Sequence, residues 1–105
     1  MTWKKIDRWT EFEPGTVVTA RTRTRHYFRV DPNPNPTEPS VVEAVEPDMI
    51  MLVVSFKEYR YECPGELEPW VKYIVGFLVD GRVLYRKFRT DITYQQDRYL
   101  KWTDP

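Results

Sequence analysis

The clearest pattern of apolar residues lies between residues 70 and 89, where two β-rich runs flank Asp80-Gly81. Asp-Gly between apolar runs favours a type I′ hairpin turn, because that turn needs positive φ at both central positions. The turn fixes a register that places Tyr85 opposite Gly76, so that the ring covers the bare backbone. The other pairs expected from this register are Val79 with Arg82, Leu78 with Val83, Phe77 with Leu84, Val75 with Arg86, Ile74 with Lys87, Tyr73 with Phe88 and Lys72 with Arg89.

Residues 16–30 form the second regular stretch. Their β-branched content and alternation predict one long strand. A period of two places four arginines and a tyrosine on one face: Arg21, Arg23, Arg25, Tyr27 and Arg29. The opposite face carries Val18, Ala20, Thr22, Thr24, His26, Phe28 and Val30.

The middle of the chain predicts a loop and two more strands. Four of the nine prolines lie in residues 31–40, which we interpret as a stiffened loop with polyproline-like character. Residues 41–46 predict a short strand, and residues 48–62 a long one. The continuous apolar run Met49–Val54 predicts that the long strand is buried there on both faces.

The two ends of the chain are less regular. Residues 2–12 are compatible with one or two helical turns or with an irregular segment docked by its Trp rings. Residues 90–102 fit either a capped helix or an alternating strand, and we favour a short C-terminal helix packed on the sheet.

These elements predict an all-β fold with a short N- or C-terminal helix. About five strands in 105 residues, separated by turn signals, are typical of a small antiparallel barrel or half-open sandwich of SH3-like or OB-like size. The length suits a single domain over residues 1–105 with the Pro-rich loop at 31–40.

Composition and charge narrow the function classes. The formal net charge is zero, which argues against a general coat for nucleic acid. The charge is nevertheless uneven: residues 1–30 carry a net +4, residues 31–69 a net −7 and residues 70–105 a net +3. The single cysteine excludes an internal disulfide, and we find no signal peptide and no run of membrane-spanning length. We therefore expect a soluble cytoplasmic protein without membrane contact.

The residue inventory does not predict a metal site, a cofactor or a catalytic centre. One His and one Cys give no pair at ligand spacing, and the four glycines are too scattered for a phosphate loop. Cys63 lies between Glu62 and Glu66, whose charges work against a reactive thiolate. The remaining enzymatic hypothesis is a small ribonuclease-like site centred on His26.

The arginine strand has two interpretations. Guanidinium groups about 7 Å apart along a strand suit the phosphates of a polyanion, and Tyr27 is suited to stacking on a base. Lys72, Lys87 and Arg89, on one face of the hairpin, would widen the patch. Alternatively, the arginines form ion pairs across the sheet with Glu43, Glu46, Glu58 or Glu62 of the acidic middle.

The aromatic content favours a partner surface. Four residues near the ends of elements are candidates for interface anchors: Trp3, Trp9, Trp70 and Trp102. The leading hypothesis is a non-enzymatic binding module for a protein partner, such as a small regulatory or inhibitory protein or an accessory subunit. Nucleic-acid binding through the arginine strand is the alternative, and edge strand 41–46 offers a route to a homodimer.

Overall fold

The computed structural model describes residues 2–20, 26–32, 41–61, 65, 70–89 and 98–103. Its strands are β1 (Thr2–Lys5), β2 (Val17–Ala20), β3 (His26–Arg29), β4 (Val42–Val45), β5 (Ile50–Tyr61), β6 (Trp70–Val79), β7 (Arg82–Arg89) and β8 (Tyr99–Thr103). The 3₁₀ turn η1 (Trp9–Glu11) follows β1. In the part of the chain that the structure describes, no helix is long and apolar enough to cross a membrane.

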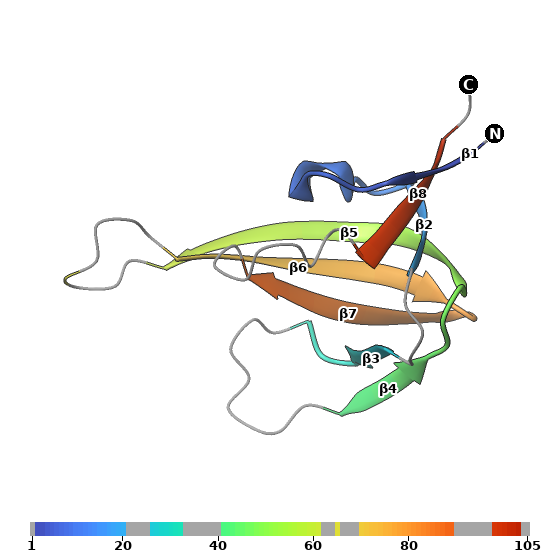
Figure 1. Cartoon of the computed structure of the whole chain (residues 1–105). Coiled ribbons are helices and arrows are strands. Elements are labelled where there is room, and N and C mark those ends of the chain that lie inside the picture. The colour runs from blue at the N-terminus through green and yellow to red at the C-terminus, as the bar shows by residue number, and fades with distance from the viewer. Residues whose placement is uncertain are drawn as a thin grey trace.

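The eight strands form one antiparallel sheet in the order β1-β8-β2-β5-β6-β7-β3-β4. Figure 1 shows the three long strands β5, β6 and β7 in the middle, with β1, β8 and β2 on one side and β3 and β4 on the other. The sheet curls into a half-barrel. The all-β class is therefore confirmed, whereas the expected five strands are too few.

The β6–β7 hairpin has the predicted register at all eight pairs. Asp80 and Gly81 have φ values of 50° and 76°, as the two central positions of a type I′ turn require. Tyr85 lies opposite Gly76, and its Cε1 atom would be 3.2 Å from a Cβ added there. The ring therefore covers the bare backbone as predicted.

The single long strand predicted over residues 16–30 is wrong. Its two ends form β2 and β3, which lie on opposite sides of the central strands. β2 pairs with β5 and β8, whereas β3 pairs with β4 and β7. The alternation holds within each piece, since Val18 and Phe28 are both buried in the core. Local alternation does not reveal that the chain changes neighbours between them.

The apolar start of β5 is buried on one face only, contrary to the prediction. Met51 and Val53 are in the core, but Ile50 is 58% exposed and Val54 is also exposed. The register with β6 shifts between Val53 and Ser55, so Val54 is the extra residue of a β-bulge.

The chain ends pair with each other. β1 is antiparallel to β8, with Trp3 opposite Trp102, and β8 also pairs with β2. The C-terminal helix that we favoured is therefore wrong over residues 99–102, which belong to β8, while residues 90–97 lie outside the described residues. The N-terminal segment contains the strand β1 and one 3₁₀ turn, so the prediction of one or two helical turns holds only for η1.

The N-terminal segment covers the concave side of the curled sheet. Ile6 and Phe12 are fully buried, and the Phe12 ring packs against Phe77, Phe88 and Tyr99 at centroid distances of 5.4–6.1 Å. The ring centroids of Trp9 and Phe88 lie 4.8 Å apart. These contacts pack the segment against β6, β7 and β8, over a core to which all strands except β1 contribute.

Glu11 ties this segment to β8. Its carboxylate accepts hydrogen bonds from the backbone N–H groups of Asp7 and Arg8, and Lys101 donates to it at 2.6 Å. Burial raises the pKa of Glu11, but the hydrogen bonds from Lys101 and the two backbone groups outweigh it, so the pKa lies below its usual value. The ionised form is thus the one that the fold stabilises.

Candidate binding face of the sheet

The sheet has one face toward the core and one face away from it. On β6, the odd-numbered residues Val75, Phe77 and Val79 point into the core. The even-numbered residues therefore point to the opposite side, which we call the outer face. This face is apolar toward the turn of the hairpin and rich in tyrosine and lysine toward its open end.

The apolar part is a row of residues that crosses six strands. The register places Trp3 opposite Trp102, Val17 opposite Leu52, Leu52 opposite Leu78, and Leu78 opposite Val83. Lys101 of β8 lies opposite Val18 of β2, so the next residue of β8, Trp102, lies opposite Val17. We call these residues the apolar row: Trp3, Trp102, Val17, Leu52, Leu78 and Val83.

The apolar row is accessible among the described residues. Leu78 and Val83 are 38% and 41% exposed, Trp102 is also exposed, and the other three members are half-buried. Ile50 projects from the same face beside Leu52. With strands about 4.8 Å apart, the row is roughly 24 Å long. An apolar surface of this extent is typical of interaction sites.

One end of the apolar row is hollowed. Trp3, Val17, Ile50 and Trp102 line a pocket of about 490 Å³. The two indole rings meet edge to face at a centroid distance of 4.9 Å. Rings fixed in this way offer a rigid apolar surface whose ordering costs little entropy on binding.

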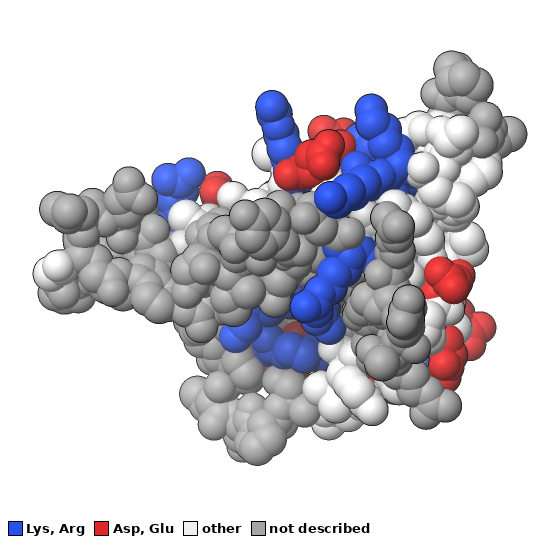
Figure 2. Space-filling view, viewed as in Figure 1, with Lys and Arg blue, Asp and Glu red and all other residues white. Residues whose placement is uncertain are grey.

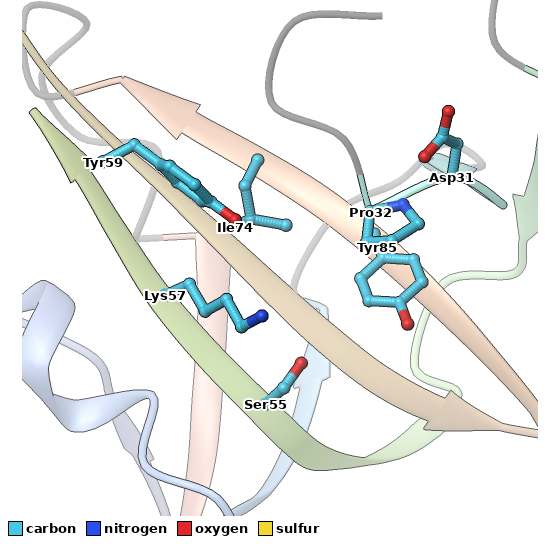
Figure 3. A pocket seen from close by; sticks show the side chains of 7 residues that line it. All are labelled: Asp31, Pro32, Ser55, Lys57, Tyr59, Ile74 and Tyr85. Atoms are coloured by element: carbon cyan, nitrogen blue, oxygen red, sulfur yellow. The ribbon is translucent and has the colours of Figure 1, made fainter. Parts of the chain in front are cut away.

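The other part of the outer face contains a second hollow, which we call the tyrosine pocket. It has a volume of about 400 Å³ and is lined by Asp31, Pro32, Ser55, Lys57, Tyr59, Ile74 and Tyr85. Figure 3 shows Ser55 and Lys57 extending from β5, and Tyr85 on the other side next to Pro32. The Tyr59 hydroxyl is directed toward Ile74 between them.

Four basic residues lie in or near the tyrosine pocket, and Lys57 is the one among them that lines it. Ile74 lies between Lys57 and Lys87 in one cross-strand row, and Lys72 lies opposite Tyr59 in the next. Arg29 lies opposite Tyr85 on the far side. Asp31 is the one acidic residue among the seven that line the pocket.

The structure brings together several of the predicted polyanion-binding residues. Tyr27 and Arg29 of β3 and Lys72 and Lys87 of the hairpin share the outer face, and Tyr27 is 61% exposed. The backbone of Arg89 lies opposite Lys72, as predicted. Arg21, Arg23 and Arg25 lie outside the described residues, as do the side chains of His26, Trp70 and Arg89 and the loop residues 33–40.

The sequence reasoning missed Lys57, Tyr59 and Tyr85 as site residues. The pairing of Tyr59 with Lys72 depends on the register of β5 against β6, and no turn signal fixes that register. The bulge at Val54 shifts the register further. The strict alternation of Ser55, Lys57 and Tyr59 was the available signal, because it puts all three on one face.

The predicted aromatic anchors divide into two groups. Trp3 and Trp102 lie on the outer face as an interface requires. Trp9 instead packs against core rings, with centroids 5.6 Å from Tyr73 and 6.3 Å from Phe12. It is therefore a structural residue.

The acidic middle of the sequence meets the basic ends in part. Glu43 of β4 pairs with Arg82 of β7, and Glu58 pairs with Arg60 on its own strand at 3.3 Å. At the top of Figure 2, basic side chains adjoin acidic ones, and a further basic group lies in the middle of the view. Among the described residues, Arg82 and Arg60 pair with glutamates of the acidic middle, while Arg21, Arg23 and Arg25 lie outside the described part.

The predicted homodimer edge, residues 41–46, contains β4. This strand lies at an edge of the sheet, and its Val42 is 51% exposed.

Within the described ranges, no three His, Cys, Asp or Glu residues come together in a way that would hold a metal ion.

No family model, curated protein or solved structure matches this chain.

Proposed function

We propose that the protein is a non-enzymatic binding module that docks a partner protein on the apolar row. One observation carries this proposal: six residues from six strands form a continuous apolar line on the outer face, three of them exposed and three half-buried. None of these residues belongs to the buried core on the opposite face. Their apolar character therefore calls for a reason other than folding.

The shape of the row supports a partner with an extended or helical apolar edge. The pocket beside Trp3 and Trp102 offers a place for one anchoring side chain, and Leu78 and Val83 continue the contact along the sheet. Trp residues in such pockets carry much of the binding energy at protein interfaces. A regulatory protein or an accessory subunit would act in this way, by covering or bridging its partner.

The test is a pull-down of partner proteins, with the double variant Leu78→Gln, Val83→Gln and the wild-type chain as separate baits. Both side chains are partly exposed, so the fold should persist, as checked by circular dichroism. Loss of two apolar contacts of about 1 kcal/mol each should weaken partner binding by roughly 30-fold. Val42→Gln is the matched control, because it changes an exposed valine of the same sheet outside the apolar row.

A partner retained by wild type and Val42→Gln but lost by the double variant supports the proposal. Equal retention by all three chains contradicts it. Sedimentation of the same three chains separates a heterologous partner from a second copy, because only self-association makes the wild-type mass depend on its own concentration.

A further inference from the structure

We infer that β4 is a dimer edge, on which β4 of a second copy of this chain adds as an antiparallel strand. This inference does not depend on the apolar row. It rests on three features of residues 41–45: the direction of their backbone groups, their exposed valine side chains, and the ion pair that neutralises their one carboxylate.

The backbone of β4 presents hydrogen-bonding groups on the side away from β3. β4 pairs with β3 and is the last strand in the order of the sheet (Figure 1). The N–H of Val30 donates to the C=O of Val41, so Val41 and every second residue after it direct their backbone groups toward β3. The N–H and C=O groups of Val42 and Ala44 therefore point away from the sheet. In the described part of the chain, no strand pairs with that side of β4.

β4 lacks the features that commonly protect a sheet edge. Lysines, prolines and bulges keep many edge strands from pairing with another chain. The four residues Val42–Val45 contain no lysine and no proline, and their register with β3 runs without a bulge. Val42 and the preceding Val41 are 51% and 69% exposed, so the edge is also apolar. Such an edge favours the addition of a further strand.

One register pairs all of residues 41–45 with the same residues of a second copy. A two-fold axis at Glu43 places Val42 opposite Ala44 of the second copy, and Val41 opposite Val45 of the second copy. The two Val42–Ala44 pairs then each exchange both backbone hydrogen bonds, because their groups point toward the new neighbour. Val41 lies beside Val45 in the closer, non-hydrogen-bonded kind of pair. The exposed valine thereby gains an apolar neighbour.

Arg82 removes the main obstacle to this symmetric pairing. The axis brings the two Glu43 side chains opposite each other, and like charges in that position destabilise a sheet. Within each chain, however, Arg82 of β7 forms an ion pair with Glu43. The two carboxylates and two guanidinium groups near the axis carry no net charge together, so a second copy fits this edge better than a charged peptide does.

The experiment is sedimentation equilibrium of the full chain up to about 0.5 mM, because such a short edge buries less area than a stable dimer needs. We expect the average mass to rise from monomer toward dimer. Ala44→Pro should raise the dimer Kd by roughly 10-fold or more, since each copy loses one outward N–H donor while its bonds to β3 remain. Ala44→Thr is the matched control, because it keeps the N–H and should dimerise like wild type. Circular dichroism checks the fold of each variant.

A second pair of variants tests the charges without introducing proline. Arg82→Gln leaves the two Glu43 carboxylates facing each other and should weaken the dimer. Adding Glu43→Gln removes that repulsion and should restore the wild-type Kd. If the ion pair served only the fold of the single chain, the double variant would dimerise no better than Arg82→Gln alone.

Three results would overturn the inference. These are a monomer at every concentration, a dimer that Ala44→Pro leaves unchanged, and a dimer that the apolar-row variant Leu78→Gln, Val83→Gln loses. The last result would place the self-association on the apolar row. Because that variant leaves β4 intact, its dimer should match the wild-type dimer, so failure of one surface is distinguishable from failure of the other.

Discussion

Gly76 shows how one residue can be fixed by close packing across three strands. A Cβ at this position would overlap the Ser55 hydroxyl on β5 and come within 3.2 Å of the Tyr85 ring on β7. Both neighbours belong to strands held on either side of β6, so neither can withdraw freely. The residue is therefore constrained although its backbone conformation is ordinary.

We expect Gly76→Ala to lower the free energy of unfolding by about 1–3 kcal/mol, the usual effect of adding a methyl group to a filled space. Urea denaturation measures this change. Ser55→Ala should be well tolerated and should recover part of the loss in the double variant, because it removes the nearest atom. If Gly76→Ala is as stable as wild type, the strands around it adjust more easily than their register suggests.

Tyr99 is the titratable side chain most deeply placed in the core. Burial raises the pKa of its hydroxyl to about 12, although Arg86 and Arg98 oppose the shift. A tyrosine has a pKa near 10 in the unfolded chain, so only the unfolded state ionises between these values. The fold therefore loses stability as the pH rises from about 10 to about 12, by roughly 2–3 kcal/mol.

The difference between wild type and Tyr99→Phe isolates this contribution from the other tyrosines. Urea denaturation at pH 8 to 12 should show a steeper alkaline loss for wild type than for the variant. If the free energies of unfolding of wild type and Tyr99→Phe fall in parallel with pH, the Tyr99 hydroxyl reaches water in the folded protein.

At the scale of elements, the hairpin was predictable because its information is local. The two residues of the turn set the register of all eight pairs, and Lys72 and Lys87 of the candidate site follow from it. The separation of β2 from β3 was not predictable, because it depends on partners far along the chain. The same holds for β8, whose pairing with β1 joins residues about 100 positions apart.

The turn itself allows a test at this scale. Gly81 has a φ of 76°, so Gly81→Ala places a Cβ in the left-handed region and should destabilise the protein by about 1–2 kcal/mol. Asp80→Asn keeps a residue that tolerates positive φ and should change stability by a few tenths of a kcal/mol at most. Thermal denaturation of both variants compares them, and equal midpoints would show that the turn does not set the hairpin.

At the scale of the whole molecule, the two faces of the sheet differ in what covers them. The concave face forms the core with the N-terminal segment, while the outer face carries the apolar row and the tyrosine pocket. The apolar row draws one residue from each of six strands, so it is invisible until the sheet order is known. In the sequence, its members Leu52, Leu78 and Val83 are indistinguishable from core residues, which led us to expect β5 to be buried on both faces.

The curled sheet leaves one side of its core to be closed by the N-terminal segment, and this closure should decide whether the molecule folds at all. Phe12 contributes most, because its ring contacts Phe77, Phe88 and Tyr99 from three different strands. We expect Phe12→Ala to lower the free energy of unfolding by about 3–5 kcal/mol, a large share of the stability of a domain this size.

The comparison is Ile50→Ala, which removes a similarly large apolar side chain from the outer face and should change stability by less than about 1 kcal/mol. Urea denaturation followed by Trp fluorescence measures the free energy of unfolding of both variants.

Hydrogen exchange then shows which strands lose their protection in Phe12→Ala. Because the segment pairs with β8 through β1 and through Glu11, loss of its anchor should expose the amides of β8 together with those of β1. If Phe12→Ala speeds amide exchange only in residues 2–12, the half-barrel is stable without its N-terminal cover.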